Sequence, residues 1–287
     1  MNTIIINYSF NLLSVFIIIS SLLLSNIHGI NIYEQYSPLV LEAENYEVIS
    51  GINYEYIYVK GNMNNSSKPT ILFLHGFPSS FHSWRFQIEH FLRQGYDCLA
   101  PNMMGYGKTY SPLNKDEYKS KSMVEHLIIL LNHLHVNDVI IIGHDFGTHV
   151  ANRFVLYQPQ RTLGVVLISG GYSKPKIFDL DQALESSRKA IGYENLGMQP
   201  KLNWYKAIIT NIDWNDEKDL DPIIKRPVLF IGGTKDYISL IAFYSGPNPY
   251  IVDLDTVALK TAHWVMEENP AAVNQELDRW IKRILSI

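Results

Sequence analysis

Short apolar runs recur along the chain and predict buried β-strands. They lie at residues 54–60, 70–75, 96–101, 138–143, 164–169 and 227–232. Several are unbroken series of β-branched or aliphatic side chains, which are typical of parallel strands covered on both faces. Between them, apolar residues recur at helical spacing in 81–93, 117–134, 146–157 and 271–284. This alternation predicts an α/β fold with a mostly parallel sheet and helices on both faces.

One internal segment departs from the alternation. Residues 172–221 contain no strong buried strand but include two helical stretches, 179–191 and 200–209. We expect this segment to be a short helical cap, inserted between two parts of the core at 31–171 and 222–287.

Residues 1–30 are largely apolar and contain no Asp, Glu, Lys or Arg. They predict a secretory signal peptide or an N-terminal membrane anchor. Both interpretations stay open. The apolar run is about long enough for an anchor that spans a bilayer, and the basic residues that usually precede the apolar part of a signal peptide are missing. Two overlapping N-glycosylation sequons at Asn64–Ser67 favour the same route. We therefore expect a glycoprotein of the secretory pathway, either secreted, in the ER lumen or associated with a membrane through this segment.

Composition narrows the range of partners. The 287 residues are 47% hydrophobic and 18% charged, which is ordinary for a globular protein with one sizeable core. The net charge of −4, without any basic run, argues against a nucleic-acid partner. The one cysteine, Cys98, excludes an intrachain disulfide and a cysteine-rich metal site, and its apolar surroundings predict a buried thiol.

The sequence GHDFG, residues 143–147, stands between a predicted strand and a predicted helix. Hydrolases of the α/β-hydrolase fold present a nucleophilic serine in this frame, on a sharp turn between the flanking glycines. Here the central residue is Asp145, and the amide groups at the start of the helix favour an anion there. The alternative is that Asp145 caps the helix.

Other positions supply partners for this carboxylate. The segment HGFP, residues 75–78, follows a predicted strand, where a backbone N–H can serve a developing oxyanion and Pro78 can fix the turn through a cis bond. A plain turn explains the segment equally well. Asp236 follows the strand at 227–232, and His263 precedes the last helix. The order of nucleophile, acid and histidine is that of the α/β-hydrolase fold.

Five stretches together resemble the epoxide hydrolases of the α/β-hydrolase superfamily, from about Ile52 to the C-terminus. They are HGFPSSFHSWRFQ, APNMMGYGKT, GHDFG, LNWYK and AHWVMEENPAAVNQELDRWI. The resemblance implies that Asp145 is the nucleophile, His263 the base and Asp236 the acid that orients the histidine.

The resemblance also assigns the groups around the substrate. It implies that the backbone N–H groups of Phe77 and Phe146 form an oxyanion hole and that Tyr205 donates to the epoxide oxygen. The implied substrates are a small apolar epoxide and water, and no metal or organic cofactor is expected because all reacting groups are side chains. A carboxylate suits this reaction, because it forms an ester that water can cleave, whereas a serine would form a stable ether.

The chain departs from the family pattern at several positions. The cap is short near Gln199–Lys201, and the first of the two cap tyrosines has no clear match, Tyr193 being the candidate. Asn102 stands where the family has an aspartate, and Ala262 where it has a glycine. Two alternatives therefore stay open. One is a haloalkane dehalogenase-like hydrolase, which would need Trp or Asn donors for the halide, and the other is a catalytically impaired binding protein of the same fold.

Overall fold

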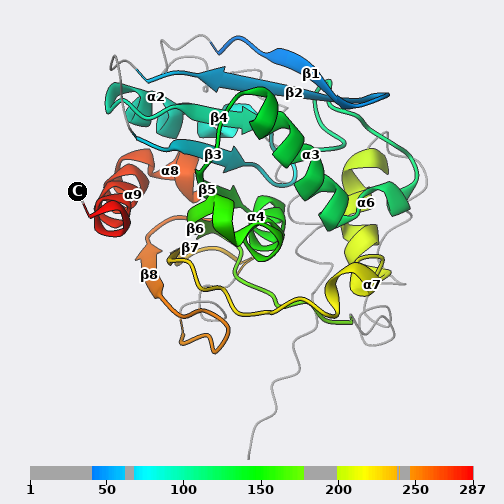
Figure 1. Ribbon diagram of the computed structural model, residues 1–287. Coiled ribbons are helices and arrows are strands. Elements are labelled where there is room, and N and C mark those ends of the chain that lie inside the picture. Colours follow the sequence, from blue (N-terminus) through cyan, green and yellow to red (C-terminus); the bar gives the residue numbers. More distant parts are fainter. Residues whose placement is uncertain (1–40, 62–67, 178–198, 238, 240–245, 287) are drawn as a thin grey trace, which may run out of the picture.

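The sheet is the centre of the molecule. The computed structural model describes residues 41–61, 68–177, 199–237, 239 and 246–286. In these residues, eight strands form one sheet in the order β1-β2-β4-β3-β5-β6-β7-β8 (Figure 1). The strands are β1 (Glu44–Ile49), β2 (Ile52–Val59), β3 (Thr70–Leu74), β4 (Cys98–Pro101), β5 (Val139–His144), β6 (Thr162–Ile168), β7 (Val228–Gly233) and β8 (Leu254–Leu259).

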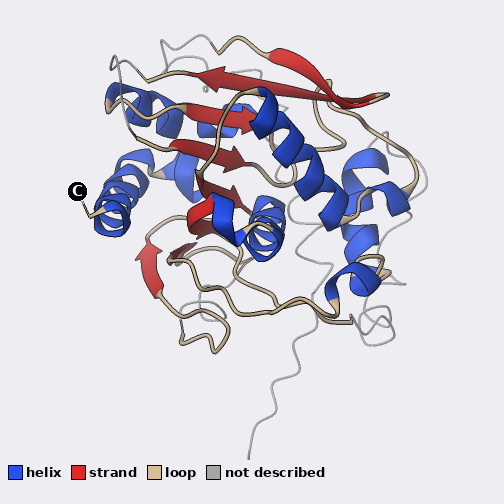
Figure 2. Ribbon diagram, in the orientation of Figure 1, coloured by secondary structure: helices blue, strands red, loops and turns tan. Residues whose placement is uncertain are grey.

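The sheet is mostly parallel, as predicted. β4, β3, β5, β6, β7 and β8 run parallel to one another, whereas β2 is antiparallel to both β1 and β4. Successive parallel strands need crossover connections, and helices supply most of them (Figure 2).

Helices cover both faces of the sheet. α3 (Ser120–His133) and α4 (Phe146–Tyr157) pack on one face, and α2 (Arg85–Arg93), α8 (Val265–Glu268) and α9 (Pro270–Leu285) on the other. The remaining described helices are α6 (Gln199–Ile209), α7 (Trp214–Glu217) and the 3-10 turns η1 (Phe81–Trp84), η2 (Lys115–Glu117) and η3 (Pro159–Arg161).

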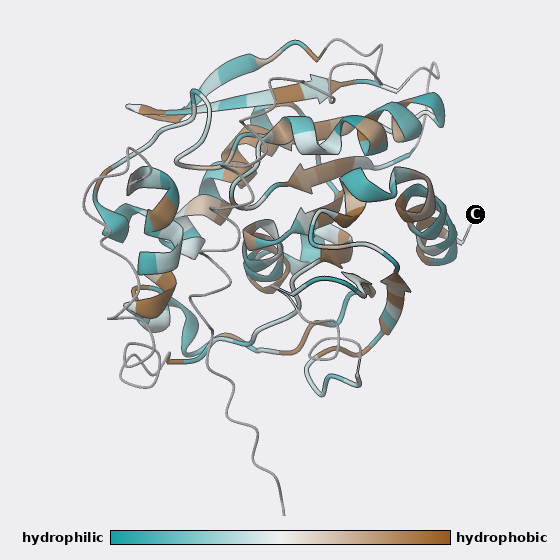
Figure 3. Cartoon of the chain, turned by 180° about the vertical axis from the view of Figure 1, so that it is seen from behind, coloured by the Kyte–Doolittle hydropathy of each residue, from teal (hydrophilic) through white to brown (hydrophobic). Residues whose placement is uncertain are grey.

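Alternate strand residues fill the two cores. Leu72 of β3 and Ile141 of β5 belong to the core under α3 and α4, whereas Ile71 and Ile140 belong to the core under α2 and α9. All four side chains are fully buried. The unbroken aliphatic runs in the sequence arise because both faces of these strands are covered. Figure 3 shows the central strands of the sheet as mainly hydrophobic.

All six predicted strands are present, with ends shifted by up to two residues, but the two edge strands were not predicted. β1 has the sequence ENYEVI and is mostly exposed. β8 has the sequence LDTVAL and is only partly buried. Edge strands need no continuous apolar run, so the pattern used to find the central strands misses them.

The predicted helices are also present, with small differences at their starts. The one predicted at 81–93 begins with the 3-10 turn η1, and the one predicted at 117–134 is interrupted, since η2 ends at Glu117 and α3 begins at Ser120. Cys98 is buried, as expected.

The helical stretch predicted at 200–209 is α6, which packs on the loop that follows β4. The indole N–H of Trp204 donates to the Met104 carbonyl at 2.8 Å, and the Asn203 amide donates to the Leu113 carbonyl at 2.9 Å. These contacts hold α6 beside the carboxyl ends of the parallel strands. The stretch predicted at 179–191 lies outside the described residues.

The predicted leader at 1–30 and the sequons at Asn64–Ser67 also lie outside the described residues. Within the described part of the chain, no helix combines the length and apolar character needed to cross a membrane.

Candidate active site

Asp145 occupies a sharp turn between β5 and α4. Its backbone has φ 51° and ψ −120°, a conformation that costs a non-glycine residue about 1–3 kcal/mol. Gly147 permits the turn, since a Cβ there would collide with the Leu74 carbonyl oxygen. The Asp145 side chain makes no hydrogen bond that caps α4, so the capping alternative is wrong.

The loop after β3 meets this carboxylate directly. The Phe77 N–H donates to Asp145 Oδ1 at 2.8 Å, and a Cβ on Gly76 would lie within 2.6 Å of the Asp145 Cβ. This loop therefore requires glycine next to Phe77. The Phe77–Pro78 peptide bond is cis, as predicted.

A buried histidine shapes the same loop. His75 Nε2 accepts from the Met103 N–H at 3.0 Å, so Nδ1 carries the proton and donates to the Gly76 carbonyl at 2.9 Å. Burial lowers the pKa of His75 to about 4, which keeps the ring neutral.

The structure brings the three predicted triad residues together. His263 Nε2 lies 3.3 Å from Asp145 Oδ2, and His263 Nδ1 lies 2.9 Å from Asp236 Oδ2. The other oxygen of Asp236 accepts from the Ser239 N–H at 2.9 Å. His263 and Asp236 are almost fully buried, whereas the Asp145 side chain is 14% exposed. The carboxylate that solvent reaches is therefore that of Asp145, on the turn between β5 and α4, which we call the elbow.

The charges of the triad depend on one another. Burial lowers the pKa of His263, but its close contacts and charge interactions with Asp145 and Asp236 outweigh burial and raise the pKa to about 9. Burial raises the pKa of Asp145, but His263, His144 and the Phe77 N–H together lower it below its ordinary value. At neutral pH the site therefore holds an ionised carboxylate beside an imidazolium.

Tyr205 packs against Phe77 and Phe146, one on each of the two segments that meet at Asp145. Its ring packs edge-on against the rings of Phe77, at 5.6 Å between centroids, and Phe146, at 4.2 Å. Phe146 is the first residue of α4, where backbone N–H groups have no partner within the helix. Tyr205 thus stands next to both predicted oxyanion-hole residues. Tyr193 lies outside the described residues.

Two neighbours of the triad were not predicted. His144 is buried, donates from Nε2 to the His263 carbonyl at 2.9 Å, and has its pKa lowered by burial to about 4. Trp264 packs edge-on against the His263 ring at 5.1 Å, and its indole N–H donates to Ser79 Oγ at 3.3 Å. The sequence could have indicated these two residues only because they adjoin Asp145 and His263.

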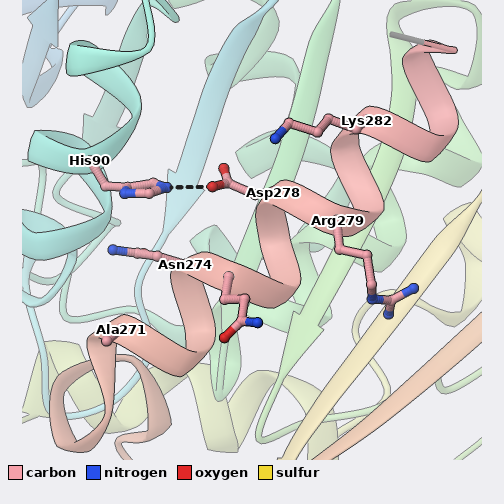
Figure 4. Close-up of a pocket in the computed structure, with 7 residues that line it drawn as sticks. His90, Ala271, Asn274, Asp278, Arg279 and Lys282 are labelled. Carbon is pink, nitrogen blue, oxygen red and sulfur yellow. Dashed lines mark hydrogen bonds and ion pairs between the residues drawn. The ribbon is translucent and has the colours of Figure 1, made fainter.

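A separate open groove lies between α2 and α9, away from these residues. It has a volume of about 650 Å³, and its lining includes His90, Asn274, Asp278 and Lys282 (Figure 4). His90 Nε2 lies 3.0 Å from Asp278 Oδ2, and Gln94 also donates to Asp278. Hydrogen bonds among His90, Gln94 and Asp278 thus join the two helices. Nowhere in the described residues do three His, Cys, Asp or Glu side chains gather in a way that could hold a metal ion.

Sequence comparison relates the chain to epoxide hydrolases. A family profile described as the α/β-hydrolase fold matches residues 69–190. Epoxide hydrolase 2 of Siraitia grosvenorii is 38% identical over 103 residues, which are 36% of this chain and 33% of that protein. Bifunctional epoxide hydrolase 2 of Rattus norvegicus is 23% identical over an alignment of 309 residues, covering 80% of this chain and 56% of that protein. The matched regions thus span about a third to about half of these relatives.

Structural comparison confirms the predicted fold. Epoxide hydrolase A from Mycobacterium thermoresistibile has a TM-score of 0.70 at 20% identity, covering 83% of this chain and 97% of that chain. An epoxide hydrolase from Vigna radiata has a TM-score of 0.69 at 21% identity, covering 85% of this chain and 98% of that chain. The chain has the α/β-hydrolase fold.

The raised pKa of His263 predicts a pH-dependent contribution to stability. Because the pKa is about 9 in the folded chain and 6.5 as a free side chain, the contribution is complete below pH 6.5 and is lost as the pH rises through 9. Urea unfolding at pH 6.5 and 9.5 should show a larger loss of unfolding free energy in the wild type than in His263→Gln. We expect the difference to be on the order of 3 kcal/mol. Equal losses in the two proteins would contradict the assigned charge state.

Proposed function

We propose that this chain, a member of the epoxide hydrolase family of the α/β-hydrolase fold, converts an epoxide and water into a vicinal diol. One observation carries the proposal. The elbow holds a carboxylate, Asp145, with the Phe77 N–H on one oxygen and His263 facing the other. A carboxylate in that position forms an ester that the neighbouring groups are suited to hydrolyse.

In the first step, Asp145 Oδ2 attacks an epoxide carbon. A C–O bond forms to the carboxylate, and the C–O bond of the three-membered ring breaks. The leaving alkoxide takes the proton of the Tyr205 hydroxyl, since a phenol with a pKa of about 10 is protonated at neutral pH. Support comes from the packing of the Tyr205 ring on Phe77 and Phe146, whose backbone N–H groups are the proposed oxyanion donors.

Ester formation prepares His263 for the second step. The charge of Asp145 is among the causes that raise the His263 pKa, and the ester removes that charge. The pKa of His263 therefore falls, and the imidazolium releases a proton, which replaces the one that Tyr205 gave to the alkoxide. The neutral imidazole can then accept a proton from water. Asp236 stays hydrogen-bonded to Nδ1 and stabilises the imidazolium that forms again.

In the second step, water attacks the carbonyl carbon of the ester, which is the Asp145 carboxyl carbon. The developing charge resides on Asp145 Oδ1, which already accepts from the Phe77 N–H. The Phe146 N–H, at the start of α4, is the second donor. Because both donors are backbone amides fixed before the reaction, they stabilise this charge without reorganisation. The intermediate then collapses, and the bond between its central carbon and Oδ2 breaks. The leaving alkoxide takes the remaining proton of the attacking water, so the diol is released and the carboxylate is restored.

The dehalogenase alternative finds less support. Halide binding needs side-chain donors beside the nucleophile, and Phe77 and Phe146 have none. Among the described residues near the site, the indole N–H groups of Trp204 and Trp264 already donate to Met104 and Ser79. A partner for a halide would have to displace one of these bonds.

The two-step mechanism predicts a trapped intermediate in His263→Gln. The variant keeps Asp145, so it should be alkylated, but it lacks the base and should not hydrolyse the ester. Intact-protein mass spectrometry after mixing with a small aryl epoxide should show the added mass of one epoxide, on a peptide that contains Asp145. His90→Gln, in the distant groove, should turn over without accumulating ester. A folded His263→Gln protein that neither turns over nor gains mass would rule out the proposed role.

Tyr205→Phe tests the donor to the epoxide oxygen. The change keeps the ring and its packing but removes the hydroxyl, so alkylation should slow by roughly one to three orders of magnitude. Stopped-flow or quenched-flow measurement of ester formation would give this rate. Tyr157→Phe, which loses a weak bond from α4 to the Asp216 carbonyl at 3.4 Å, is the matched control and should react normally. Wild-type alkylation by Tyr205→Phe would place the donor elsewhere, with Tyr193 the next candidate.

A further inference from the structure

A buried polar network lies beneath the loop that carries the Phe77 amide. Asn102 follows β4 and is 3% exposed, and Glu55 on β2 is 8% exposed. The Asn102 side chain donates from Nδ2 to Glu55 Oε2 at 2.7 Å and accepts at Oδ1 from the Phe81 N–H at 3.0 Å. Both ends of this one amide are therefore in use.

The network is closed on its other side. Glu55 Oε2 also accepts from the Lys108 N–H at 2.9 Å. The Thr109 hydroxyl accepts from the Glu55 N–H at 2.9 Å and donates to the Asn102 carbonyl at 2.7 Å. The loop from Asn102 to Thr109 is thus fixed to β2 by side chains that are themselves buried, where a lost hydrogen bond is costly.

Two consecutive residues hold the Phe77 loop at both ends. Asn102 binds the Phe81 N–H, and the Met103 N–H binds His75 Nε2 at 3.0 Å. Phe77 lies between these anchors, and its own N–H is directed at Asp145 Oδ1. A shift of either anchor would therefore move the amide relative to the carboxylate.

We infer that Asn102 and Glu55 are positioning residues for the Phe77 amide, and that they work only as a matched pair. Glu55 accepts, so residue 102 must donate toward it while still accepting from Phe81. An amide does both. An aspartate, the residue of the family pattern, would place a second carboxylate about 3 Å from Glu55, and their repulsion makes ionisation of both groups costly. The departure at Asn102 is thereby explained by Glu55.

Other charged groups near Glu55 come from η1 and α2. Burial lowers the pKa of His82, the charge of Arg85 lowers it further, and the charge of Glu55 opposes them. Arg85 also lies 3.4 Å from Glu267. His82, Arg85 and Glu267 are unchanged in every variant below, so their titration affects variant and wild type alike. The ratio of the two rates at each pH therefore reports on the Asn102–Glu55 pair.

The decisive variant is Asn102→Asp. At pH 8 the two carboxylates repel, the Phe77 amide moves, and hydrolysis of the alkyl-enzyme ester should slow by about tenfold to a hundredfold, while alkylation changes less. At pH 5.5 the two carboxylates should share a proton, and the hydrolysis rate of the variant relative to wild type should recover. Asn102→Asp combined with Glu55→Gln should restore much of the rate at pH 8, because the glutamine can donate to the new carboxylate. These rates rest on the proposed function.

A second measurement does not depend on that function. Hydrogen exchange of a peptide covering residues 75–84 should be faster in Asn102→Asp than in wild type at pH 8, and slower again in the double variant. Asn274→Asp, the same change at another buried site on α9, should leave exchange in this peptide and ester hydrolysis unchanged. If Asn102→Asp fails to fold, Asn102→Ala removes the Phe81 partner and should give the same step-specific loss without pH dependence.

The two measurements distinguish the possible failures. Wild-type exchange in both Asn102→Asp and Asn102→Ala would overturn the positioning role, whether or not the chain hydrolyses epoxides. So would a loss in Asn102→Asp that is equal at every pH and is not reduced by Glu55→Gln. If the expected exchange pattern is not seen, this inference fails. If the exchange pattern is seen but the wild-type chain does not turn over an epoxide, only the proposed function fails.

Discussion

The negative charge of Asp145 has to be stabilised where solvent reaches only 14% of the side chain. Burial alone would raise the pKa of this carboxyl and neutralise it. The Phe77 N–H and His263 oppose that effect, each from one oxygen of the carboxylate. They can do so because β3 and β5 are neighbours in the sheet and the segment after β8 brings His263 to the carboxyl end of β5. The same two contacts then separate the roles of the two oxygens. Oδ1 accepts from the Phe77 N–H, and Oδ2 faces the histidine.

Strand order explains why these segments meet. The chain crosses from β3 to β4 in one direction along the sheet and returns to β5 on the other side of β3. Loops that leave the carboxyl ends of β3 and β5 therefore diverge and leave space for a ligand between them, as expected at a switch point of an open parallel sheet. The Phe77 loop and the Asp145 elbow are these two loops. Glycine is required in both, since side chains at Gly76 or Gly147 would occupy the space of the neighbouring strand or carboxylate.

The sequence predicts structure correctly where a local pattern of residues has a single physical explanation. The aliphatic runs of β3 and β5 need two covered faces, and the GHDFG turn needs small residues around Asp145. It fails for β1 and β8, whose side chains are largely solvated and carry no distinctive period. It also fails for contacts between side chains remote in sequence. Asn102 could be noted as a departure from the family pattern, but Glu55 lies 47 residues away, and nothing in the sequence indicates that the two pair. The predicted domain boundaries and the roles assigned to the site residues stay predictions.

The nucleophilic role of Asp145 is tested most directly by following oxygen atoms. If Asp145 forms an ester, the oxygen added to the substrate comes from its carboxylate, and the oxygen of water stays on the enzyme. With enzyme in excess and a single turnover in oxygen-18 water, mass spectrometry should therefore find mostly unlabelled diol, and label should appear in the diol only after further turnovers. Full labelling of the diol in the first turnover would contradict the account and leave Asp145 as a general base for direct attack by water.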